Sequence, residues 1–213
     1  ITLRIGPFTV RIQSTIGSVA EGIHLLYAQY PMERNASFAD FHVCLQRPRT
    51  FRRWFRPQVL FSFDGYVPFK PLPLAQAFPF FEWGLNWCVA KHANQYLILH
   101  AAVLERQGRA VIMAGPPGSG KSTLCAGLVA RGWRLLSDEL ALISPEDGYI
   151  TPLPRPVSLK NDSIYVIRSF APDMTFGRQA VDTNKGTVVH VKVPDSSMKR
   201  ARERVPPAWV VCA

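Results

Sequence analysis

One eight-residue stretch constrains this chain more than any other feature. It reads Gly115-Pro116-Pro117-Gly118-Ser119-Gly120-Lys121-Ser122, a complete G-x-x-x-x-G-K-S sequence, and Thr123 follows it. Small residues in such a loop let successive backbone N–H groups turn inward around a phosphate. Lys121 can then reach the β- and γ-phosphates of a nucleotide, and the Ser122 hydroxyl can hold Mg²⁺. The whole stretch, with Thr123, is therefore a predicted nucleotide-binding site.

The residues on either side of the loop agree with this interpretation. Residues 109–114 are a short apolar run suited to a buried strand, and residues 122–131 read as a helix that Gly132 ends. Strand, glycine-rich loop and helix form the context in which this motif binds phosphate. The alternative, a glycine-rich turn without function, does not account for these flanks.

The bulk composition excludes several classes of protein. A length of 213 residues with 47% hydrophobic content suits one large domain, or a core domain carrying a smaller one. No run approaches the roughly 18 apolar residues of a membrane-spanning helix. The four cysteines form no C-x-x-C pair, which predicts neither a zinc site nor a disulfide framework and favours a reducing, cytoplasmic setting. The chain opens on Ile1 rather than Met, so further sequence is expected before it.

The chain is markedly basic, with 25 lysines and arginines against 15 acids and a net charge of +10. Arginines and aromatic residues alternate within residues 47–56, and a second basic cluster spans residues 199–204. A stretch of this kind can bind nucleic acid or an acidic peptide. A solvated hairpin with inward-facing aromatic residues explains the first cluster equally simply, and nucleic acid is not an expected partner.

The pattern along the chain changes near residue 74. Before it, strand-length apolar segments lie at residues 8–13, 41–46 and 59–63, and a tight turn is predicted at Asp64-Gly65. We expect a small β-rich lobe over residues 1–74, closed by a stiff proline-containing connector. From residue 75 the pattern is α/β: a helix at 75–93, then strands at 96–104, 109–114, 133–137, 140–143, 188–193 and 208–211. The proline-rich stretch after residue 151, which contains Lys160, is expected to be a loop.

Paired acids follow the predicted helix. Phosphoryl transfer needs a metal ligand, a base for the incoming hydroxyl and cations near the developing charge. Asp138 and Glu139 end a predicted strand, where P-loop proteins place the acid that supports Mg²⁺. Neighbouring side chains on an extended chain point in different directions, so one acid can face the metal and the other a substrate hydroxyl. The sequence does not say which, and a solvated turn is the alternative.

Four further residues are candidates for the chemistry. His100 lies in an apolar strand fifteen residues before Gly115 and is either catalytic or a packed core histidine. Arg155, Lys160 and Lys185 are candidates for stabilising the charge that accumulates on the transferred oxygens. Ordinary surface charge is the alternative for each of these three.

The order of these elements resembles the bacterial HPr kinase/phosphorylases and their HPr-kinase-related relatives. Those proteins carry a histidine on a strand, a G-K-S loop, a helix closing on Arg-Gly and a strand ending in paired acids, as do His100, residues 115–122, Arg131-Gly132 and Asp138-Glu139 here. The resemblance implies a kinase core shared with phosphoenolpyruvate carboxykinase, and phosphorylation of a serine hydroxyl with ATP and Mg²⁺. It also matches His100 to the family's active-site histidine and Asp138 to the first of its two active-site aspartates.

The chain departs from the regulatory enzymes of that family in several places. Glu139 stands where they have Asp, Thr123 replaces their usual Glu, and their glycine-rich E-I-R-G-type segment is missing. These features resemble the HPr-kinase-related subgroup, which tends to occur beside peptide-modification genes and includes kinases of lasso-peptide precursors. The resemblance therefore supports phosphoryl transfer better than it supports the protein HPr as the acceptor.

The sequence thus predicts a P-loop kinase core with a β-rich N-terminal lobe. The predicted reaction moves the γ-phosphoryl group of ATP to a serine of a peptide or small protein, with Asp138, helped by His100, acting on the hydroxyl. Mg²⁺ would bind Ser122 with Asp138 or Glu139. The alternatives are a small-molecule kinase, a phosphoserine phosphorylase and a non-catalytic nucleotide-binding adaptor. The family precedent for assembly is a hexamer.

Overall fold

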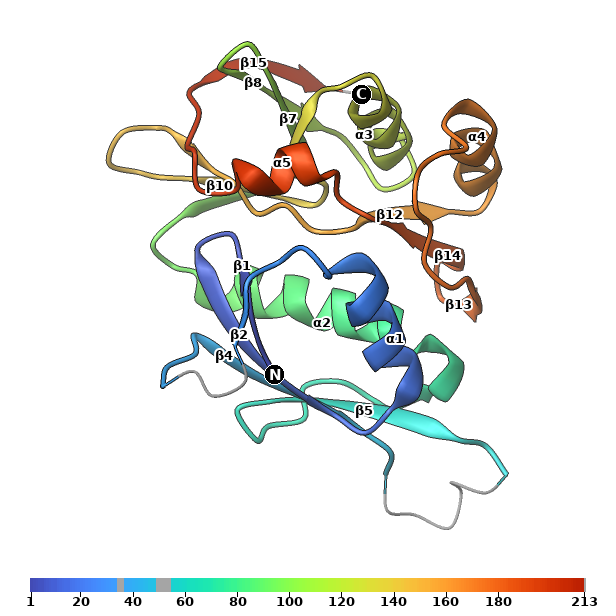
Figure 1. Cartoon of the computed structure of the whole chain (residues 1–213). Helices are drawn as coiled ribbons and strands as arrows, with labels where there is room; N and C mark the ends of the chain where they lie inside the picture. The colour runs from blue at the N-terminus through green and yellow to red at the C-terminus, as the bar shows by residue number, and fades with distance from the viewer. Residues whose placement is uncertain (34–36, 49–54, 213) are drawn as a thin grey trace.

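The computed structural model describes residues 1–33, 37–48 and 55–212. Its N-terminal part is a six-stranded sheet (Figure 1). The strands, in spatial order, are β3 (Met32–Glu33), β1 (Thr2–Ile5), β2 (Phe8–Ser14), β4 (Phe41–Gln46), β5 (Gln58–Phe63) and β6 (Leu72–Pro73). Only the β2–β4 pair among them is parallel. The three strands predicted in this lobe are confirmed, and Asp64 and Gly65 form the predicted turn with positive φ at both residues.

Helix α2 (Ala77–His92) lies between this sheet and the rest of the molecule (Figure 1). Pro79 is tolerated in its first turn because N–H groups there have no partner within a helix. Most of its side chains are buried, as a helix covered on both sides requires. The predicted helix at residues 75–93 is confirmed. Helix α1 (Gly17–Leu26), which we did not predict, packs beside it and buries Val19, Ile23 and Leu26.

The close approach of α2 to β5 depends on Gly84. A Cβ atom added at Gly84 would lie 2.0 Å from the Phe61 ring, which is fully buried. Gly84→Ala should therefore lower the free energy of unfolding by about 1–3 kcal/mol, measured by urea denaturation, because the ring cannot move without disturbing the core. Gly127→Ala is the matched control. Its Cβ would meet nothing nearer than 4.0 Å, and the helix should gain about 0.5–1 kcal/mol. Equal effects at the two sites would contradict this account.

The second part contains a six-stranded sheet and a smaller three-stranded one. The larger follows the order β11 (Ile150–Thr151), β10 (Leu140–Ile143), β7 (Leu97–Arg106), β8 (Arg109–Ala114) and β15 (Pro207–Cys212), and β9 (Arg134–Ser137) also pairs with β7. The smaller consists of β12 (Val157–Lys160), β14 (Gly186–Val191) and β13 (Ala180–Thr183). Helices α3 (Lys121–Ala130), α4 (Asp162–Phe170) and α5 (Asp195–Lys199) complete this part. The predicted strands and the loop helix are confirmed, and Gly132 ends α3 with φ +84°.

The proline-rich stretch differs from the expectation. Residues 157–160 are strand β12, paired with β14, so Lys160 ends a strand and does not lie in a loop. The prediction of a loop was wrong because Pro152, Pro154 and Pro156 all precede β12. At those positions they remove no hydrogen bond between β12 and β14. Helices α4 and α5 and strand β13 were also not predicted, whereas Lys185 does lie in the turn between β13 and β14.

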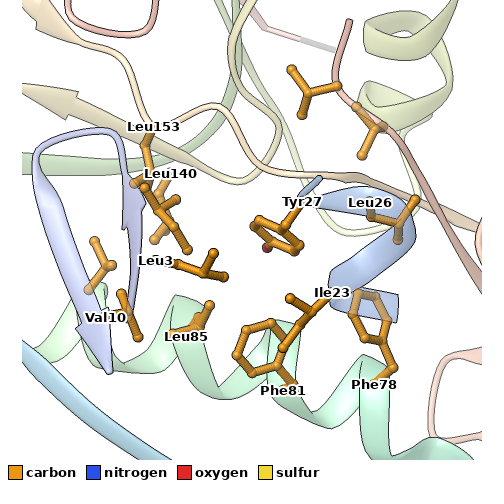
Figure 2. Packing of buried hydrophobic residues seen from close by; sticks show 14 of the residues in the cluster. Leu3, Val10, Ile23, Leu26, Tyr27, Phe78, Phe81, Leu85, Leu140 and Leu153 are labelled. Carbon is orange, nitrogen blue, oxygen red and sulfur yellow. The ribbon is translucent and has the colours of Figure 1, made fainter. Parts of the chain in front are cut away.

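One hydrophobic core runs through both parts of the molecule. Figure 2 shows Leu3 of the first sheet and Leu85 of α2 close to Leu140 and Leu153 of the second part, and all four belong to the same buried cluster. Tyr27, at the end of α1, is packed into it as well. The boundary that we expected at residue 74 remains a prediction, since α2 packs against elements on both sides of it.

The two basic clusters and the cysteines can be compared with the structure only in part. Of the arginine-rich segment, residues 49–54 lie outside the described residues. In the C-terminal basic cluster, Arg200 pairs with Glu105 and Glu203. All four cysteines are free thiols, as expected, but only Cys88 and Cys125 are buried. Among the described residues, no helix is long and apolar enough to cross a membrane.

Candidate active site

The glycine-rich loop connects β8 to α3 and leaves the start of the helix open. Gly118 and Gly120 have φ near +88°, a conformation that residues with a side chain rarely adopt. No side chain caps the N-terminus of α3. The N–H groups of its first turn have no partner within the helix, and the helix dipole favours negative charge there. The loop therefore has the geometry that binds phosphate at a helix N-terminus.

The Lys121 side chain folds back and contacts its own loop. Its Nζ donates to the carbonyl oxygens of Gly115 at 2.7 Å and Pro116 at 2.8 Å, and lies 3.5 Å from the Ser119 Oγ. These contacts place the ammonium group over the loop. A phosphate bound by the loop would lie next to this ammonium group. It would compete with the Gly115 and Pro116 carbonyls for the hydrogen bonds that the group donates.

The paired acids occupy a bend between β9 and β10. Both strands pair with β7, with Ser137 opposite Val103 and Leu140 opposite His100, so the bend lies across from the middle of β7. Because β9 and β10 both pair with β7 on either side of Asp138 and Glu139, the neighbouring strands fix the position of both acids.

Asp138 faces the loop helix. Its carboxylate is buried, with Oδ2 accepting the Ser158 N–H at 2.9 Å, and Oδ1 has no hydrogen-bond partner among the described residues. Burial, reinforced by Glu139, raises the pKa of Asp138 to about 6, although hydrogen bonds from Ser158 and the Ser122 hydroxyl and the charge of Lys160 oppose the rise. A carboxyl with a pKa just below neutrality suits a general base.

Glu139 faces the opposite way, toward α2. Its Oε2 accepts a hydrogen bond from Asn86 Nδ2, and its charge acts on Glu82 and on the buried His190. The two acids thus diverge, as neighbouring side chains do on an extended chain. Asp138 belongs to the loop side of the bend and Glu139 to the α2 side.

His100 lies on β7, the strand next to β8, as the sequence predicted. It is exposed and lies opposite Leu140, and the N–H of the next residue, Ala101, donates to the Glu139 carbonyl at 3.2 Å. The structure therefore places His100 beside the acid bend on an accessible part of the strand. It is not a packed core histidine.

The three candidate cations occupy different surroundings. Lys160, at the end of β12, lies close enough to Asp138 and His190 to lower the pKa of both. Lys185 holds its Nζ 5.6 Å from the centroid of the Trp83 ring. Arg155 is buried, and its guanidinium binds Glu82 and Asn86. Arg155 therefore reaches the acids through Asn86.

A strained residue holds the two lysines together. Asn161, directly after Lys160, has φ +52° and ψ −126°, a region that residues with side chains avoid. Its Oδ1 accepts the Thr187 N–H at 3.0 Å and its Nδ2 donates to the Lys185 carbonyl at 3.4 Å. These bonds tie the end of β12, which carries Lys160, to the β13–β14 turn, which carries Lys185.

A small cavity of about 20 Å³, room for about one water molecule, lies behind the acid pair. Its lining includes side chains that sequence analysis did not single out, namely Glu82, Trp83, Asn86, Ser158 and His190. Several buried polar atoms around it have no partner among the described residues, including Asp138 Oδ1, Ser158 Oγ and His190 Nδ1. Burial lowers the pKa of His190 to about 3, so this imidazole is neutral near pH 7.

A divalent cation fits this donor set only together with substrate oxygens. Within the described ranges no group of three histidine, cysteine or acidic residues could hold a metal ion. Ser122 and the acids offer hard oxygen ligands, and the unpartnered Oδ1 of Asp138 is one of them. Mg²⁺ usually takes one or two carboxylates, water and substrate phosphates, so the residues present suit it.

Comparison with known proteins finds one matching family model and one distant relative that is a kinase. Residues 84–160, from α2 to the end of β12, match the family model described as "SynChlorMet cassette protein ScmC". The HPr kinase/phosphorylase of Nitrosomonas europaea is 31% identical over an alignment of 132 residues, which covers 58% of this chain and 39% of that protein. The chain therefore spans well under half the length of this relative. The likeness is distant, and it indicates a kinase-like relationship.

Proposed function

We propose that this chain is an ATP- and Mg²⁺-dependent kinase that phosphorylates a serine hydroxyl of a peptide or small protein. The observation that carries the proposal is the buried Asp138 carboxylate, which faces Ser122 at the start of the loop helix and leaves Oδ1 unpartnered. A base directly beside a phosphate-binding helix terminus is the arrangement that phosphoryl transfer requires. The distant kinase relative supports the same reaction class.

In the proposed reaction the loop residues 115–123 bind the phosphates of ATP. Mg²⁺, held by Ser122 and one of the two acids, would neutralise phosphate charge when bound. Asp138 takes the proton of the serine hydroxyl as its oxygen attacks the γ-phosphorus. The bond from that phosphorus to the bridging oxygen breaks, and ADP leaves. Lys160 and Lys185 stabilise the charge on the transferred oxygens, and His100 orients the hydroxyl.

The acceptor should carry acidic residues. The net charge of +10 attracts such a peptide and raises its rate of encounter. The proposal is tested by incubating the protein with γ-labelled ATP, Mg²⁺ and candidate serine peptides, and reading the products by mass spectrometry. Phosphate-dependent pyrophosphate release from a phosphopeptide would instead identify a phosphorylase. Nucleotide binding without any turnover would identify an adaptor, and transfer only to small alcohols a small-molecule kinase.

Lys121→Met should weaken ATP binding by about 10–100-fold, because charge-assisted hydrogen bonds are worth about 1.5–3 kcal/mol each. Isothermal titration calorimetry with a non-hydrolysable ATP analogue and Mg²⁺ measures the change. Lys70→Met removes the same charge from an exposed position away from the loop and should leave the affinity unaltered. Unchanged affinity in Lys121→Met would rule out the proposed phosphate site.

A further inference from the structure

A continuous chain of hydrogen bonds leads from the N-terminal part of the molecule to Glu139. The Tyr27 hydroxyl donates to Glu82 Oε1 at 2.7 Å, and Arg155 Nη2 donates to Glu82 Oε2 at 2.5 Å. Arg155 Nη1 donates to Asn86 Oδ1, and Asn86 Nδ2 donates to Glu139 Oε2. Every link is a direct contact between side chains, so the position of Glu139 depends on residues of α1 and α2.

The direction of the Asn86 amide follows from the chemistry of Arg155. A guanidinium group has donors only, so the side of Asn86 that faces it must be the carbonyl oxygen. The NH₂ group then points the other way, toward Glu139, where it meets a carboxylate that only accepts. Arg155 therefore sets the orientation of Asn86, and Asn86 in turn holds Glu139.

The geometry of the helix makes this relay possible. Glu82 and Asn86 are four residues apart on α2 and share one face of the helix. Both of them bind the same guanidinium through two nitrogens of one planar fork, which a lysine ammonium does not have. The segment carrying Arg155 is itself anchored, since the Tyr30 hydroxyl donates to the Pro154 carbonyl at 3.0 Å.

The burial of the Glu82–Arg155 pair calls for an explanation other than stability. Both residues are under one-tenth exposed, and replacing a buried ion pair with apolar residues is often neutral or stabilising. The guanidinium of Arg155 is directed at α2, since Nη1 donates to Asn86 and Nη2 donates twice to Glu82. From there its contacts lead to Glu139.

We infer that Asn86 and Arg155 are positioning residues that hold the Glu139 carboxylate on the α2 side of the acid bend, apart from Asp138. The inference deepens the proposed function and rests on it. It connects Tyr27, which follows α1, to the acid bend through Glu82, Arg155 and Asn86. Without the relay, Glu139 is free to turn away from its place in the site, while the phosphate-binding loop is untouched.

The test compares Asn86→Asp and Asn86→Leu with the wild type. Asn86→Asp keeps an acceptor for Arg155 but replaces the donor to Glu139 with a like charge, and Asn86→Leu removes both contacts. Loss of a group that orients a metal or substrate ligand typically costs about 10–100-fold, and we expect kcat to fall by this amount in both variants. The KM for ATP should stay within about threefold, because neither change touches the loop. ATP-analogue affinity, measured by calorimetry, should be equally unaffected.

Two further variants separate positioning from folding. Arg155→Lys keeps a positive charge beside Glu82 but replaces the planar fork that binds Glu82 and Asn86 with a single nitrogen on a shorter reach, so its kcat should fall while the protein stays folded. Asn94→Asp introduces the same charge at an exposed position just after α2 and should behave as the wild type. A melting temperature close to that of the wild type shows that a low kcat does not come from unfolding.

The outcomes distinguish the inference from the proposed function. If the wild type transfers phosphate and both Asn86 variants do so with unchanged kcat, the relay is not a positioning device and the inference is wrong. A fall in ATP affinity that matches the fall in kcat would also overturn it. If the wild type binds ATP but transfers phosphate to no acceptor, the proposed function fails, and the inference fails with it.

Discussion

Replacing Asp138 with asparagine is expected to stop phosphoryl transfer and, at the same time, to stabilise the metal-free protein at neutral pH. Removal of a general base lowers rates by about 10²–10⁴-fold, which radiolabel transfer or mass spectrometry would detect. Asparagine is nearly isosteric, and its Oδ1 can accept the Ser158 N–H that Asp138 accepts. The two effects have one origin, which is the burial of a negative charge.

The sign of the stability effect follows from the pKa shift. The pKa of Asp138 is raised from 3.8 in the unfolded chain to about 6 in the fold. The folded state therefore holds the proton more tightly, and the stability from that proton is fully present below pH 3.8 and lost as the pH rises through 6. Above pH 6 the ionised carboxylate costs about 3 kcal/mol, and this is the gain expected for Asp138→Asn.

Urea denaturation of the metal-free protein at several pH values would measure this gain. The difference between Asp138→Asn and the wild type should be largest near pH 8 and should shrink as the pH falls from 6 toward 4. Asp173→Asn, at an exposed position, should show little difference at any of these pH values. A variant that is less stable than the wild type at pH 8, or that retains full transfer, would refute the assignment of Asp138.

Breaking the Glu82–Arg155 pair is expected to destabilise the fold by about 3–5 kcal/mol, because either single change leaves a buried charge without its partner. The two single variants should differ in their pH dependence. In Glu82→Leu the buried cation stays charged, since arginine does not lose its proton in this range. The cost of that variant should be the same at pH 5 and pH 8.

In Arg155→Met the buried group is a carboxylate, which can take up a proton. Burial already raises the pKa of Glu82 in the wild type, and loss of Arg155 removes the main group that opposes the rise. The cost should therefore be smaller at pH 5 than at pH 8. The stability supplied by the bound proton is present at low pH and disappears as the pH rises through the folded-state pKa.

The double variant Glu82→Leu/Arg155→Met completes the cycle. It should lose much less stability than the sum of the single variants, because no unpaired charge remains. The exposed Arg204–Asp147 pair supplies a control, and Asp147→Asn should have little effect on urea denaturation. Additive losses in the double variant would show that the two residues do not act as a pair.

Much of the fold could be predicted from local patterns. The strand, glycine loop and helix around residues 109–131 carry their own signals in apolar period, glycine placement and helix end. Helix α1 was missed although Val19, Ile23 and Leu26 have helical spacing, because strand-like segments surround it. Strand β12 was missed because the prolines before it were read as a loop, and the pairing with β14 that makes it a strand is not local.

The candidate site divides in the same way. The loop, Asp138 and His100 could be found because they lie in one continuous stretch with fixed spacing. Glu82 and Asn86 left a readable signal that we did not use, namely two polar residues four apart in the apolar first three turns of the helix. His190 left none, since a single histidine in an apolar strand gives no sign that it packs behind an acid fifty residues earlier. The burial of Arg155 likewise depends on its ion pair with Glu82 of α2. The presence of an arginine in the sequence does not indicate this partner.

The common core of the two parts limits how this molecule can accommodate its substrates. Many enzymes of two lobes open and shut about a hinge, and the hinge works because little apolar surface crosses it. Here Leu3, Leu85 and Leu140 sit in one cluster, so swinging the lobes apart would expose that cluster to water. Under the proposed function, a nucleotide would then enter by local rearrangement, chiefly by release of Lys121 from the carbonyls of its own loop. The two parts of the protein would keep their relative positions in this step, and the Lys121 side chain would be the group that moves.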